Sequence, residues 1–77
     1  MEFTAELRRS PGTAVLAVRG ELDPATVERF RRALAEACQP RPPLLVVDLD
    51  GVPFLCSASL GALVVARTEA LAQGTRI

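Results

Sequence analysis

The sequence predicts an α/β domain in which a mixed, mainly parallel sheet begins with an N-terminal β-hairpin and packs against helices. Three patterns predict this class. Strand-like alternation fills residues 3–20, helical stripes occur twice further on, and an apolar run, "LLVV", separates the stripes. A strand, a helix and a further strand in succession are typical of parallel pairing with right-handed crossovers. We therefore expect the order β-β-α-β-α-β in a single domain spanning residues 1–77.

The N-terminal hairpin is predicted by alternation on either side of a turn. Phe3, Ala5 and Leu7 share one face of a strand over residues 3–9, as expected of a half-buried edge strand. The sequence "SPGT" supplies turn residues. A denser apolar run then predicts a second, deeper strand over residues 14–20.

The first helix is predicted over residues 24–38. Asp23 followed by Pro24 is a helix start signal, because the carboxylate accepts from a free N–H and proline needs no donor there. Pro40 ends the helix. The apolar face has helical spacing and consists of Val27, Phe30, Leu34 and Cys38.

A buried strand over residues 44–49 and a helix over residues 58–73 follow. The run "LLVVDL" lacks polar alternation before its aspartate, which predicts a central strand covered on both faces. Gly74 stands where a helix C-terminal glycine belongs, and "TRI" predicts the start of another strand. The expected core consists of Val15, Leu16, Val18, Val27, Phe30, Leu34, Leu45, Val46, Val47, Leu60, Leu63, Val64 and Leu71.

Charge and apolar run length narrow the possible environments. Nine arginines balance nine acidic residues and lysine is absent, so no basic excess indicates binding to nucleic acid or to a membrane. The apolar runs are far shorter than the roughly 20 residues that span a bilayer, and no secretory leader pattern opens the chain. We expect a cytoplasmic protein.

The residue types also disfavour several chemistries. A serine or cysteine nucleophile usually needs a base, and the chain contains no His and no Lys. Phosphate-binding and dinucleotide-binding glycine motifs are missing. Asp48 and Asp50 alternate at a strand end, where carboxylates more often serve turns than magnesium, so we predict neither metal nor cofactor. Cys38 and Cys56 are expected to be buried free thiols.

Ser57 stands at the start of the second predicted helix. Its position favours a helix N-cap, which is worth typically ~1 kcal/mol over alanine. A helix N-terminus also tolerates a phosphate, because free N–H groups and the positive end of the helix dipole lie there. The two roles are compatible.

Two segments resemble the STAS domain of anti-sigma factor antagonists. They are "GELDPAT" before the first helix and "LLVVDLDGVPFLCSASLGALVVA" across the buried strand, loop and second helix, and the resemblance covers about residues 14–74. It implies the STAS fold. It also implies that Ser57 is the phosphoacceptor of an anti-sigma factor with serine kinase activity. The unphosphorylated antagonist would bind this kinase, and the sigma factor would be released.

The sequence differs from the usual family pattern at two positions. The usual family pattern D-S-[ST]-G reads Cys56-Ser57-Ala58-Ser59, so cysteine replaces the acidic residue and serine replaces the glycine. Ser59 is therefore a second hydroxyl in the same turn. Family domains continue through a completed strand and a further helix, so we expect the C-terminal part of the domain to be missing and the open sheet edge to favour weak self-association.

The leading hypothesis is a non-enzymatic partner-switching module that controls sigma-factor-dependent transcription. One alternative is a phosphorylation-independent STAS scaffold or ligand-sensing module, which Cys56 favours. Another is an enzyme, which the absence of His and Lys disfavours. The residues expected to bind the partner are Asp23, Asp50, Cys56, Ser57, Ala58 and Ser59.

Overall fold

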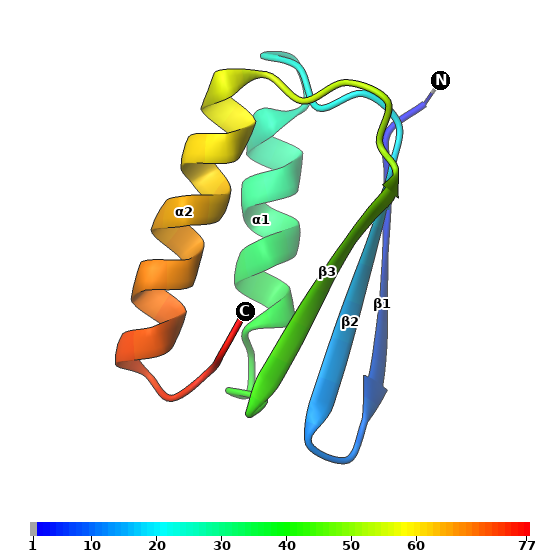
Figure 1. Cartoon of the computed structure of the whole chain (residues 1–77). Coiled ribbons are helices and arrows are strands. Elements are labelled where there is room, and N and C mark those ends of the chain that lie inside the picture. Colours follow the sequence, from blue (N-terminus) through cyan, green and yellow to red (C-terminus); the bar gives the residue numbers. More distant parts are fainter. Residues whose placement is uncertain (1) are drawn as a thin grey trace.

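The computed structural model describes residues 2–77 and has the element order β-β-α-β-α (Figure 1). The predicted α/β class is confirmed, and each of the five elements lies near its predicted range. The first helix begins at residue 27 rather than 24. The elements are β1 (Thr4–Ser10), β2 (Thr13–Arg19), α1 (Val27–Ala37), β3 (Leu44–Gly51) and α2 (Ser57–Ala72).

The three strands form one mixed sheet in the order β1-β2-β3. β1 pairs antiparallel with β2, so that Leu7 lies opposite Leu16. β2 pairs in parallel with β3, so that Leu16 also lies opposite Val47. β2 is therefore the central one of the three assigned strands, and β3 has a neighbour on its other edge only at the bridge between Leu44 and Arg76.

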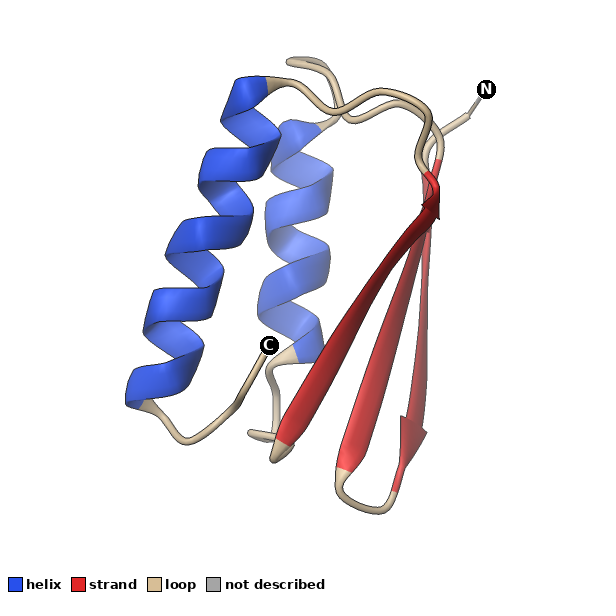
Figure 2. Ribbon diagram, in the orientation of Figure 1, coloured by secondary structure: helices blue, strands red, loops and turns tan. Residues whose placement is uncertain are grey.

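Both helices lie on the same face of this sheet (Figure 2). The burial pattern of β2 reflects this one-sided cover. Ala14, Leu16 and Val18 are buried, while the residues between them are only half-buried. On β3 the side chain of Val46 is 42% exposed. The expectation that residues 44–49 are covered on both faces is therefore wrong, since no helix covers the second face within residues 2–77.

The core lies between this sheet face and the helices. Of the predicted core residues, five are buried: Leu16, Val18, Phe30, Leu34 and Leu45. Four are half-buried at its border: Val15, Val27, Val47 and Leu63. Buried residues that the prediction missed include Phe3, Ala14, Leu22 and Ala37.

The predicted buried face of α2 is wrong. Leu60, Val64 and Leu71 are 50%, 57% and 45% exposed. The buried positions hold small residues instead, namely Ser59, Ala62 and Ala70. α2 is apolar on more than one face, so the positions of its largest apolar side chains do not identify the face that packs against the core.

The predicted final strand is present as a single parallel bridge beside β3. Leu44 pairs with Arg76, the Leu45 N–H donates to the Arg76 carbonyl oxygen at 2.7 Å, and the Arg76 N–H donates to the Pro43 carbonyl oxygen at 3.0 Å. This bridge places the C-terminal residues at the outer edge of β3. Separately, no helix within residues 2–77 is long and apolar enough to cross a membrane.

Phe30 tests the position of the core. Its side chain is completely buried, so we expect Phe30→Ala to lower the free energy of unfolding by about 3–5 kcal/mol. Val64→Ala is the matched control, and a substitution at this exposed position should change stability by less than about 0.5 kcal/mol. Urea denaturation measures both. Equal losses would show that the core has been misplaced.

Gly20 tests the packing of the N-terminal segment against the end of β2. It has a φ of +98°, and a Cβ at this position would lie 2.7 Å from the Glu2 carbonyl oxygen. We expect Gly20→Ala to destabilise the fold by about 1–3 kcal/mol. In contrast, Gly61→Ala fills open space in α2 and should stabilise by about 0.5–1 kcal/mol. Shifts in the same direction for the two variants would contradict this assignment.

Candidate functional site

Two loops meet at the end of the fold where α2 begins (Figure 1). One leads from β2 to α1 and the other from β3 to α2. The Leu22 N–H donates to the Phe54 carbonyl oxygen at 3.0 Å, and the Leu22 carbonyl oxygen accepts from the Cys56 N–H at 2.8 Å. Leu22 also forms a parallel bridge with Leu55. The two loops therefore converge at this end of the fold.

Asp23 follows this junction directly and organises the turn before α1. Its Oδ1 accepts from the N–H groups of Ala25 at 2.9 Å and Thr26 at 3.1 Å. Its own N–H donates to the Thr26 hydroxyl oxygen at 3.0 Å. The predicted capping chemistry is present, but it serves a turn over residues 23–26, and this turn delays the helix until Val27.

Ser57 is the first residue of α2, and its side chain is exposed. The N-cap is Cys56, so the prediction that Ser57 is the N-cap is wrong by one position. The first turn of a helix has N–H groups without intrahelical partners and carries the positive end of the dipole. The Ser57 hydroxyl therefore lies on the solvent side of a terminus that favours negative charge.

Ser59 differs from Ser57 in its access to solvent. Its residue surface is 0% exposed, and its hydroxyl donates to the Leu22 carbonyl oxygen at 3.3 Å. Its oxygen also lies 3.2 Å from the Cys56 sulfur. Of these two serines, only Ser57 is therefore exposed to solvent. Ala58, between them, is exposed.

The carboxylates at the end of β3 are placed as the sequence suggested. The Asp50 N–H donates to Asp48 Oδ1 at 2.9 Å, which is the turn role expected for such a pair. Asp50 is exposed, whereas Asp48 is half-buried. Among the residues that the structure describes, no three His, Cys, Asp or Glu side chains gather closely enough to hold a metal ion.

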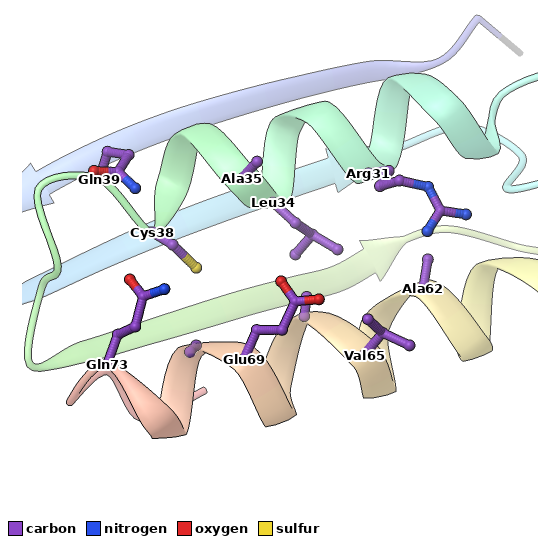
Figure 3. A pocket seen from close by; sticks show the side chains of 11 residues that line it. Arg31, Leu34, Ala35, Cys38, Gln39, Ala62, Val65, Glu69 and Gln73 are labelled. Carbon is purple, nitrogen blue, oxygen red and sulfur yellow. The ribbon is translucent and has the colours of Figure 1, made fainter.

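The sequence did not predict the groove between α1 and α2, which has a volume of about 240 Å³ (Figure 3). Leu34, Ala62 and Ala66 contribute apolar surface, and Cys38 and Glu69 lie among its lining residues. Burial, and then the Glu69 carboxylate, raise the pKa of the Cys38 thiol. The groove does not include Ser57 or either of the converging loops.

The other thiol lies in a different environment. Cys56 is half-buried at the N-cap of α2. Hydrogen bonding with the Ser59 side chain, and then with the Ser59 backbone, lowers the pKa of the Cys56 thiol. The expectation of two buried thiols is therefore wrong in degree, because both cysteines are only half-buried.

The fold is that of a known family. The STAS domain family matches residues 4–77, so the chain belongs to the STAS domain family. The chain is 37% identical over 65 residues to the anti-sigma-F factor antagonist RsfB of Mycobacterium tuberculosis. That match covers 84% of this chain and 52% of RsfB, so the chain spans about half the length of this relative.

Solved structures of anti-sigma factor antagonists share the fold. One from Mycobacterium paratuberculosis has a TM-score of 0.83 and 31% identity, over 88% of this chain and 58% of that protein. The antagonist SpoIIAA in its unphosphorylated form has a TM-score of 0.72 and 25% identity, over 96% of this chain and 69% of SpoIIAA. The phosphorylated form of this Bacillus cell-fate determinant also has a TM-score of 0.72, at 26% identity over 99% of this chain and 69% of that protein.

The two cysteines should differ in their reaction with iodoacetamide. The thiolate is the reactive form, and the opposite pKa shifts give Cys56 the larger thiolate fraction at neutral pH. We expect Cys56 to be alkylated faster than Cys38, and its rate to level off at a lower pH. Mass spectrometry of the Cys38→Ala and Cys56→Ala variants measures each rate alone. Faster alkylation of Cys38 would contradict the assigned environments.

Proposed function

We propose that this chain is a non-enzymatic anti-sigma factor antagonist, that it binds an anti-sigma factor with serine kinase activity, and that Ser57 is its phosphoacceptor. The observation that carries the proposal is the exposed Ser57 hydroxyl at the start of α2, beside a second serine that is buried. The proposal places the chain in the cytoplasm, in the control of sigma-factor-dependent transcription.

The proposed docking surface combines the two converging loops with the outer face of α2. Asp23 and Asp50 contribute the loop ends, and residues 56–59 contribute the helix start. Leu60 and Val64 follow Ser57 at i+3 and i+7, so the three share one side of the helix. Both apolar side chains are at least half exposed. A partner that contacts Ser57 therefore also meets an apolar surface that gains from burial.

Phosphorylation of Ser57 would change the charge of this surface more than its shape. A phosphate adds about −1.5 to −2 charges at neutral pH, and the helix terminus stabilises them. The acidic side chains of Asp23, Asp48 and Asp50 belong to the same end of the fold and add to the negative field. Like charges brought together at an interface can cost several kcal/mol, so the partner would be released.

The comparison with SpoIIAA supports a switch of this kind. Its phosphorylated and unphosphorylated forms both match this chain with a TM-score of 0.72. A modification that leaves the overall fold of a relative equally similar to this chain is expected to act through local charge and contact.

The proposal predicts opposite effects on partner binding for two substitutions at Ser57. Ser57→Ala should bind the anti-sigma factor but resist release by ATP, because it cannot accept phosphate. Ser57→Asp should bind the anti-sigma factor at least about tenfold more weakly, because it places a carboxylate at the helix start. Its circular dichroism spectrum should stay unchanged. Calorimetry with and without ATP measures both affinities.

Ser59→Ala is the control for the site of modification. Phosphate incorporation should persist in this variant and disappear in Ser57→Ala, as read by mass spectrometry. Equal affinities of wild type and both Ser57 variants, with no phosphate transfer, would instead indicate the phosphorylation-independent scaffold or ligand-sensing module.

A further inference from the structure

The two residues that depart from the family pattern touch each other. Cys56 stands where the pattern usually has an acidic residue, and Ser59 stands where it usually has glycine. In the fold, Cys56 is the N-cap of α2 and Ser59 lies three residues further on, with their side-chain sulfur and oxygen 3.2 Å apart. The second departure is therefore in direct contact with the first.

The Ser59 hydroxyl has a single proton and two neighbours that can accept it. One is the Cys56 sulfur at 3.2 Å, and the other is the Leu22 carbonyl oxygen at 3.3 Å. When Ser59 donates to Leu22, the contact with Cys56 must be made by the thiol proton. The result is a chain of two hydrogen bonds from the thiol, through the hydroxyl, to the backbone of the neighbouring loop.

An acidic residue at position 56 would break this chain. A carboxylate only accepts hydrogen bonds, so it would draw the Ser59 proton away from Leu22. The buried Leu22 carbonyl would then accept only one hydrogen bond, from the main-chain N–H of the substituted residue 56. A thiol or another neutral donor at position 56 leaves Ser59 free to bind Leu22.

The Ser59 hydrogen bond joins the two loops of the docking surface. Leu22 is completely buried and immediately precedes Asp23, while Cys56 immediately precedes Ser57. The Leu22 carbonyl oxygen accepts from both the Cys56 N–H and the Ser59 hydroxyl. The position of the Asp23 turn relative to Ser57 therefore depends on these two contacts.

We propose that Cys56 and Ser59 are a coupled pair of positioning residues that together set how Ser57 is presented to its kinase. The pair replaces the acidic residue and glycine of the usual pattern, and each residue works only with the other. This inference rests on the proposed function for its kinase readout, and it has a second readout in the loop junction itself.

A double-mutant cycle tests the coupling. The proteins are wild type, Cys56→Asp, Ser59→Gly and the double variant, and the measurement is kcat/KM for phosphorylation of Ser57 by the cognate anti-sigma factor. Each single substitution should lower kcat/KM by about 5- to 10-fold, the effect of one or two lost hydrogen bonds. The double variant, which restores the usual pair, should lie within about threefold of wild type. Independent effects that multiply would overturn the proposal.

A conservative substitution separates positioning from simple packing. Cys56→Ser keeps a donor at the N-cap, so its kcat/KM should stay within about twofold of wild type, whereas Cys56→Ala should lose about fivefold. Circular dichroism and the thermal midpoint confirm that each variant folds. Equal losses for the serine and alanine variants would show that the donor is irrelevant.

Amide hydrogen exchange measures the junction without a partner. The residue 56 N–H should lose protection at least fivefold in Cys56→Ala, Cys56→Asp and Ser59→Gly, keep it in Cys56→Ser, and regain it in the double variant. If wild type accepts no phosphate but the exchange follows this order, the proposed function fails and the coupled pair stands as a structural joint. If wild type accepts phosphate and neither readout shows coupling, the pair is refuted and the proposed function stands.

Discussion

The backbone of Leu22 is the constraint on which the site depends. Its N–H and carbonyl groups bind Phe54 and Cys56, at 3.0 and 2.8 Å, so the loop after β2 and the loop after β3 run together as if they extended the sheet. The Leu22 side chain is completely buried, which fixes this junction to the core. The Asp23 turn and the start of α2 occupy their positions because they are the next residues along each chain segment.

The sequence was sufficient for the order and the approximate bounds of the elements. Alternation and turn residues placed the hairpin, and the Asp23-Pro24 pair placed the start of the first helical region to within three residues. α1 was also predicted on the correct face, because its polar and apolar residues segregate clearly. Phe30 and Leu34, the two largest members of its apolar stripe, are both buried.

The prediction failed in two situations. One is a helix with apolar residues on several sides, and the other is a contact between residues far apart in the sequence. α2 carries small and large apolar residues on different sides, and the side with Ala62 and Ala70 packs against the core. Close approach of two helices favours the small residues, which a stripe of large side chains does not reveal. The contact of Ser59 with Leu22 spans 37 residues, so no local pattern indicates it.

Two of the three hydrogen bonds between Leu22 and residues 54–59 join main-chain atoms alone. Main-chain groups are the same in every non-proline residue, so the frame persists when side chains around it change. Substitutions at exposed positions such as 54 and 58 can therefore change the surface around Ser57 without moving this frame. The chemistry of this surface can thus diverge among proteins of the same fold while the scaffold beneath it stays fixed.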